Sequence, residues 1–77
     1  MAPTVFRIWN LKVIIYPKDH FPPHVHICGP EAEAKFDMRS WECIESFGFT
    51  ENSLKKIRQY LKERESTLWE VWNEYQE

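Results

Sequence analysis

Apolar and polar residues alternate along the first part of the chain. Two β-branched and aromatic runs, residues 5–8 and 11–16, flank Asn10. The second run has two faces, with Leu11, Val13 and Ile15 on one and Lys12, Ile14 and Tyr16 on the other. A period of two is typical of strands with one buried face. We therefore predict two strands joined by a tight turn at Asn10, a residue that tolerates the left-handed conformation.

The same alternation continues on both sides of Gly29-Pro30, in HVHIC at residues 24–28 and EAEAKFD at residues 31–37. A hairpin centred on Gly29-Pro30 places every apolar residue on one face, which is the arrangement that burial favours. That register predicts four cross-strand pairs: Ile27 with Ala32, Val25 with Ala34, His26 with Glu33, and His24 with Lys35. A short final strand is predicted near residues 42–45.

From residue 51 onward the apolar positions recur at helical spacing. They form one stripe, interrupted only by Glu65, that contains Leu54, Ile57, Leu61, Leu68, Trp72 and Tyr75. Thr50, Asn52 or Ser53 can cap its start. The continuous phase predicts a single helix over residues 53–75. The counter-signal is Thr67 with Glu70, a capping box that would restart a second helix after Glu65.

A single helix of about 25 residues would be roughly 37 Å long, which exceeds the width of a small sheet of short strands. Its last two turns would overhang that sheet and leave apolar side chains uncovered. We therefore predict that a second chain, either another copy or a small cognate protein, covers Leu68, Trp69, Trp72 and Tyr75.

Together these patterns predict an α+β fold, a small antiparallel β-meander of four to five strands followed by a long C-terminal helix. The 77 residues allow one domain, 1–77, with the sheet in 4–46 and the helix in 51–76. A core of this size is small, and the aromatic fraction of 16% helps to fill it.

Composition narrows the class of protein. Cys28 and Cys43 are too few for a disulfide scaffold, so we expect reduced thiols in a cytoplasmic protein. The chain shows neither a cleavable signal nor a segment long enough to span a membrane, so no membrane association is expected. The formal net charge of −2 argues against a general nucleic-acid binder.

The candidate chemistry lies in DHFPPHVHI at residues 19–27, where all three histidines occur as H-x3-H-x-H. His24 and His26 are two residues apart on a predicted strand and therefore share a face. His20 precedes them across a rigid Pro-Pro bend that would fold it back over that face. Because Val25 and Ile27 must face the core, the parity predicts that His24 and His26 are solvated.

Three interpretations of this cluster are open. In the first, His20, His24 and His26 bind a divalent metal such as zinc, with Glu33 as a fourth ligand or as a partner that holds one ring. In the second, no cofactor is needed, and the three histidines with Glu33 form a catalytic or anion-binding site. Lys12, Lys18 and Lys35 would then stabilise negative charge. In the third, the histidines only fill the polar face of the sheet.

The whole chain resembles a bacterial family known only as domain of unknown function 4160. The resemblance is carried by Pro3, Tyr16, Asp19-His20, Pro22-Pro23-His24, His26, Ala32-Glu33 and Trp72, and DHFPPHVH is its most specific part. Two positions depart from the family pattern, Asn10 where glycine is common and Val25 where an aromatic residue is common. Neither departure touches the candidate site.

The resemblance implies a small prokaryotic protein encoded beside another small protein, as in a toxin–antitoxin pair. We therefore expect a component of such a two-gene module whose histidine site acts on RNA or a phosphate ester, as a ribonuclease-like or phosphate-ester hydrolase activity. His24→Ala should then abolish activity with little loss of stability. The alternatives are a non-catalytic interaction module that neutralises its partner, and a small metal-binding domain.

Overall fold

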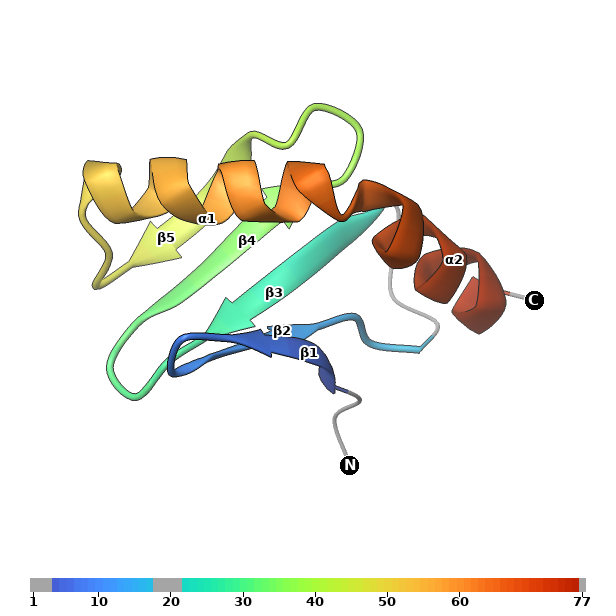
Figure 1. Cartoon of the computed structure of the whole chain (residues 1–77), viewed down its shortest axis with the longest axis horizontal. Helices are drawn as coiled ribbons and strands as arrows, with labels where there is room; N and C mark the ends of the chain where they lie inside the picture. Colours follow the sequence, from blue (N-terminus) through green and yellow to red (C-terminus); the bar gives the residue numbers. More distant parts are fainter. Residues whose placement is uncertain (1–3, 18–21, 77) are drawn as a thin grey trace.

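The computed structural model describes residues 4–17 and 22–76, and in it five strands precede two helices (Figure 1). The elements in chain order are β1 (Thr4–Ile8), β2 (Leu11–Ile14), β3 (His24–Cys28), β4 (Glu33–Asp37), β5 (Cys43–Phe47), α1 (Glu51–Glu63) and α2 (Glu65–Gln76). The strands form one antiparallel sheet in the order β1-β2-β3-β4-β5. The predicted α+β meander with C-terminal helical structure is therefore confirmed.

The alternation divides the sheet into two faces. Its inner face contributes Val13, Val25, Ile27 and Phe36 to a buried cluster that also contains Ile57 and Leu61 of α1. Helix α1 lies along this side of the sheet (Figure 1). We name the opposite side the outer face, and its side chains include Lys12, His26, Cys28, Glu33, Lys35 and Glu45.

The first turn lies where the sequence predicted it. Ile8 pairs with Leu11, so Trp9 and Asn10 alone connect β1 to β2. The residue with positive φ is Trp9, at 52°, rather than Asn10. A bulky side chain in this region costs roughly 1–2 kcal/mol, so the remainder of the hairpin has to hold Trp9 there.

The register of the β3–β4 hairpin differs by two residues from the predicted one. The observed pairs are His24 with Asp37, Val25 with Phe36, His26 with Lys35, Ile27 with Ala34, and Cys28 with Glu33. The amide of Gly29 donates to the carbonyl of Ala32 at 2.8 Å, so Pro30 and Glu31 stand at the centre of the turn. Pro30 thereby takes the first central position, which suits its fixed φ, whereas the predicted turn put it second. Both registers bury the same faces, so alternation alone could not separate them.

The prediction of one continuous helix is wrong. Helix α1 ends at its C-cap Arg64, whose amide donates back to the carbonyls of Leu61 and Lys62, and α2 begins at Glu65. The two axes turn apart there, and α2 crosses the end of the sheet where β3 begins (Figure 1). The capping-box counter-signal pointed to this region, although the restart comes before Thr67.

Burial explains the turn. Leu68 is fully buried, and Trp72 is 3% exposed within the single chain. Burying a side chain of this size stabilises the fold by about 1.5–3 kcal/mol, whereas one backbone hydrogen bond contributes about 0.5–1.5 kcal/mol, so burying both side chains offsets the loss of two or more bonds at the break. The argument for a second chain over Leu68, Trp69, Trp72 and Tyr75 therefore does not hold. Trp69 and Tyr75 are half-buried and pack against the same core.

Glu65, the polar residue inside the apolar stripe, has a structural partner. The indole Nε1 of Trp41 donates to its carboxylate at 3.1 Å. Trp41 is buried in the β4–β5 connection with φ at 60°, so this bond ties that connection to the first turn of α2. Neither helix is both long and apolar enough to cross a membrane over the part of the chain that is described.

Candidate functional site

Strand β3 places two of the three predicted site histidines together. His24 and His26 lie on the same side of the strand, and their ring centres are 4.9 Å apart. His20 and Lys18 lie outside the described residues. The predicted convergence of three histidines therefore stays a prediction. The two described histidines have different surroundings, and the difference separates a packed end of the strand from an open groove.

His24 is buried, contrary to the predicted solvated position. It is only 7% exposed, and the Trp72 ring of α2 lies 6.2 Å from its own. The His24 Nδ1 lies 2.7 Å from the carbonyl oxygen of Pro22. A carbonyl oxygen only accepts, so Nδ1 is the nitrogen that donates in this contact. The predicted face of His24 was right, because it leaves the strand on the same side as His26. Helix α2 covers this end of the strand and buries the side chain.

His26 lies one step further along β3, in a groove on the outer face. The ring of Tyr16 stands edge-on to it at 4.8 Å between centres, and Lys35 is its partner on β4. The groove has a volume of about 360 Å³ and is lined by Tyr16, His26, Ile27, Cys28, Glu33, Ala34, Lys35, Glu45, Ser46 and Phe47. We name it the His26 groove.

The charges around the His26 groove differ from the predicted arrangement. The Lys35 Nζ lies 3.2 Å from the Glu45 carboxylate. Glu33 faces Cys28 instead of His26, because of the two-residue change of register, although it still lines the groove. Burial raises the pKa of the Cys28 thiol, and the Glu33 carboxylate raises it further. Lys12, the neighbour of Cys28 on β2, acts in the opposite direction.

A metal site made of three histidines would need His20, which lies outside the described residues. Within residues 4–17 and 22–76, no three His, Cys, Asp or Glu side chains are grouped so that they could hold a metal ion. His24 and His26 supply two imidazoles, and the predicted third ligand is His20. Glu33 stands opposite Cys28 and not opposite His26, so the cross-strand pairing on which its predicted role as a fourth ligand rested is absent.

Some groove residues were missed by the sequence prediction. Tyr16 carries a signal, because it continues the outer-face parity of β2 beyond the last paired residue. Glu45 and Phe47 carry none, because β5 pairs with β4 through a bulge between Lys35 and Phe36. No alternation rule predicts the position of a bulge.

The groove borders an open edge of the sheet. Strand β5 is the last strand, and all five of its residues are exposed. Two of them are large and apolar: Phe47 is 70% exposed and Ile44 is 47% exposed. Such an edge presents backbone donors and acceptors together with apolar side chains to another chain.

These features define a small α+β domain with one helix-covered sheet face and a groove on the other. The chain belongs to the family described as Domain of unknown function (DUF4160), whose model matches residues 10–73. The match includes both described histidines, the His26 groove and Trp72, and it confirms the family resemblance. No curated protein and no solved structure matches the chain.

Proposed function

We propose that this chain is a non-catalytic protein-interaction module, the neutralising half of a two-gene bacterial module that acts in the cytoplasm. The observation that carries the proposal is the exposure of all five β5 residues at the sheet edge. An extended segment of the partner would add to this edge as a sixth strand. Main-chain hydrogen bonds would supply affinity, and the side chains beside the groove would supply specificity.

The side chains of β5 indicate the chemistry of that segment. Glu45 and Phe47 point to the outer face, since they pair with Lys35 and Glu33. A strand laid beside β5 would therefore place one side chain next to an acidic residue and the next on that face beside an exposed aromatic ring. A basic residue and an apolar residue two positions apart satisfy both neighbours, in the order that the direction of the added strand sets.

A second copy of β5 satisfies them less well. If two β5 strands pair antiparallel about a twofold axis with all five residues matched, Glu45 of one copy meets Glu45 of the other. Like charges directly opposite each other are destabilising in a sheet. We therefore favour a different protein as the partner, as the two-gene arrangement of the resemblance implies.

The surroundings of the histidines favour binding over catalysis. His24 is packed between the Pro22 carbonyl and Trp72, as a residue that stabilises the fold would be. The His26 groove is continuous with the exposed edge, since Ser46 and Phe47 line both.

The test measures binding of the purified product of the adjacent gene by titration calorimetry. Combining Ile44→Asp with Phe47→Asp should weaken binding at least about tenfold, because it replaces the two large apolar side chains of the edge with charges, and loss of a central apolar contact can cost about 2 kcal/mol or more. The matched control is Trp9→Asp, which changes an equally exposed aromatic residue at the β1–β2 turn. Equal affinities of the two variants and the wild type would refute the docking edge.

A second candidate function rests on His26. Tyr16, His26 and Lys35 lie together in the groove, which offers a titratable imidazole beside a cation, as acid–base attack on RNA or a phosphate ester requires. Growth assays separate the two candidates. The interaction module predicts that the adjacent gene product arrests growth and that this chain relieves the arrest. The catalytic alternative predicts that this chain alone arrests growth and that His26→Ala removes the arrest.

A further inference from the structure

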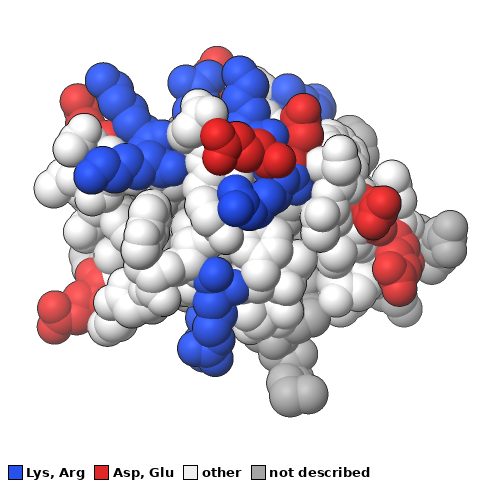
Figure 2. Space-filling view, in the orientation of Figure 1, with Lys and Arg blue, Asp and Glu red and all other residues white. Residues whose placement is uncertain are grey.

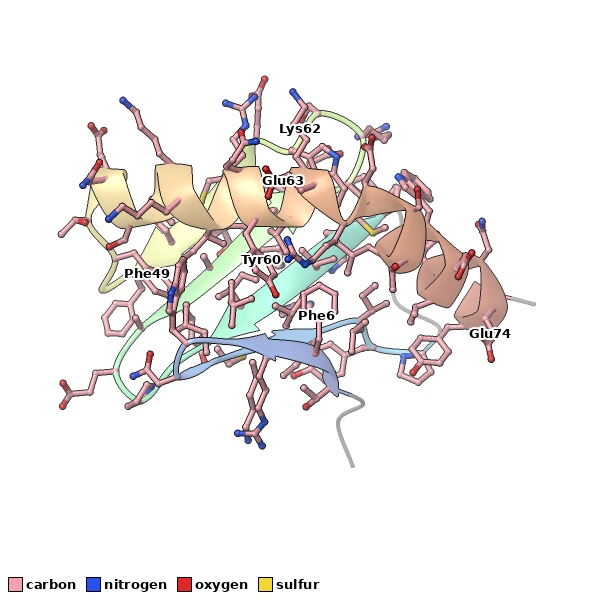
Figure 3. All side chains as sticks on the ribbon, viewed as in Figure 1. Phe6, Phe49, Tyr60, Lys62, Glu63 and Glu74 are labelled. Carbon is pink, nitrogen blue, oxygen red and sulfur yellow. The ribbon has the colours of Figure 1, made fainter. Side chains whose placement is uncertain are left out.

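A second surface, away from β5 and the His26 groove, combines aromatic and basic side chains. It lies where the β1–β2 turn meets α1, and we name it the aromatic–basic surface. Its members are Trp9, Phe49, Lys56, Tyr60 and Arg64. Figure 3 shows Tyr60 extending from α1 toward Phe6 of β1, and their ring centres are 5.8 Å apart.

The rings and the guanidinium form a connected series. The ring of Trp9 lies 6.3 Å from that of Tyr60, and the guanidinium carbon of Arg64 lies 3.6 Å from the centre of the Tyr60 ring. Trp9 is 68% exposed, although most of the large apolar side chains in the described chain are buried. One face of its indole is therefore available to stack on a flat ligand.

A groove lies beside Trp9. Its volume is about 360 Å³, and it is lined by Trp9, Asn10, Leu11, Phe49, Ser53, Lys56 and Ile57. Asn10 and Ser53 offer hydrogen-bonding groups, and Lys56 offers a positive charge. Aromatic walls with a few polar groups and one cation match a flat, polar and anionic ligand.

Charge is segregated between the two helices. Helix α1 with its C-cap contains five basic residues, Lys55, Lys56, Arg58, Lys62 and Arg64, against Glu51 and Glu63. Helix α2 contains Glu65, Glu70 and Glu74 and neither Lys nor Arg. Figure 2 shows blue side chains gathered over the part of the molecule that α1 occupies, and red ones over α2. The net charge of −2 therefore hides a basic helix beside the exposed tryptophan.

We propose that the aromatic–basic surface binds single-stranded nucleic acid, with a base stacked on Trp9 and the adjoining phosphates held by Lys56 and Arg64. Stacking on an exposed aromatic side chain suits any base, because every base has a π-face. Paired bases are stacked on each other inside a duplex, so a single strand fits this surface better. The function goes beyond the proposed protein partner, which would use the opposite edge of the sheet.

The negative charge of Glu63 partly offsets the positive charge of Arg64 on this surface. Its carboxylate accepts from Gln59 Nε2 at 3.2 Å and lies 3.7 Å from Arg64 Nη1. A phosphate near Arg64 would compete with Glu63 for that guanidinium. Glu63→Gln should therefore strengthen binding, whereas loss of an unrelated surface charge should not.

Fluorescence anisotropy of the intact chain with labelled single strands of mixed-sequence RNA and DNA tests the proposal. We expect binding that weakens as salt rises. Trp9→Asn should weaken it about 5- to 100-fold, which is the range for loss of one base–aromatic stack. Asn tolerates positive φ, so this variant should unfold at or above the wild-type temperature.

Charge reversal supplies a matched pair. Lys56→Glu changes a residue that lines the groove, whereas Lys62→Glu makes the same change on the other flank of α1. We expect a clearly larger loss for Lys56→Glu. The proposal is overturned if no single strand binds at low salt, or if Trp9→Asn binds as wild type does. It is also overturned if Lys56→Glu and Lys62→Glu lose equally, or if a duplex or a polyglutamate peptide binds as tightly as the single strand.

Discussion

Two positions on one face of β3 carry the same residue type and have opposite surroundings. At the first residue of the strand, His24 is enclosed by Trp72 and bonded to the Pro22 carbonyl. Two residues later, His26 is half-buried in a groove beside Tyr16 and Lys35. Both side chains leave the sheet on the same face, so the strand itself does not distinguish them. The difference comes from α2, which covers one end of the sheet and leaves the groove open.

The DHFPPHVH motif therefore has two separable parts. The Pro-Pro-His part fixes the start of β3 through a side chain that bonds to the backbone two residues earlier. The following His presents chemistry to the outer face. Treating the histidines as one catalytic unit, as spacing alone suggests, combines a buried residue that is bonded to the backbone with one that lines the groove.

The largest effect is expected at the residue that encloses His24. Trp72→Ala should lower the free energy of unfolding by about 3–5 kcal/mol, because it removes a buried aromatic side chain and leaves a cavity against His24. Urea denaturation followed by circular dichroism measures the change. Trp69→Ala, at a half-buried position in the same helix, is the control and should cost clearly less. Equal losses would mean that α2 is not anchored through Trp72.

The two histidines provide the direct test of the comparison. His24→Ala should cost about 1–3 kcal/mol, because it deletes a buried ring and its bond to the Pro22 carbonyl. His26→Ala should cost less than about 1 kcal/mol, as is usual for a partly exposed position. Thermal and urea unfolding of both variants give the two values. A larger loss of unfolding free energy for His26→Ala than for His24→Ala would contradict the assignment of His24 as the residue that stabilises the fold.

The two cysteines allow the reactivity of a thiol in the groove to be compared with that of a thiol at the sheet edge. Cys28 is half-buried in the groove, and burial and Glu33 raise its pKa. Cys43 on β5 is exposed. Iodoacetamide at neutral pH should therefore modify Cys43 several-fold faster, since the thiolate is the reactive form. Peptide mass spectrometry at timed intervals measures both rates, with Cys28→Ser as the control. Faster modification of Cys28 would show that the groove opens more than its burial indicates.

The smallest effect is expected at Asp37, the β4 partner of His24. Hydrogen bonds from the Arg39 side chain and amide lower the pKa of the Asp37 carboxyl from 3.8 to about 2. The folded pKa is depressed, so the contribution to stability is present above about pH 4 and is lost as the pH falls toward 2. The free energy of unfolding of Arg39→Ala should therefore lie below that of wild type at neutral pH. The difference between the two should shrink as the pH falls from about 4 to about 2. A gap that stays constant from neutral pH to pH 2 would assign the loss to packing.

Local patterns in the sequence were sufficient to predict the strands, the helical region and the side chains that face the core. Alternation placed Val13, Val25, Ile27 and Phe36 inside, because a strand with one buried face requires a period of two. The helical stripe placed Leu61, Leu68 and Trp72 on one apolar face, and the structure buries all three within the single chain. The Asn10 turn and the placement of His24 and His26 on one face were also local consequences of sequence.

Only the tertiary structure decided the helix break and the burial of His24, whereas the register of the β3–β4 hairpin followed a local turn preference that alternation does not express. The β3–β4 register shifts by two without moving any side chain to the other face, so alternation could not choose, and the position of Pro30 in the turn did. The stripe kept its phase across Arg64, so periodicity gave no break. The break arises because a straight helix would leave Leu68 and Trp72 in water, whereas a turned one buries them. That same turn brings Trp72 to His24, a contact between residues far apart in the chain that no local pattern encodes.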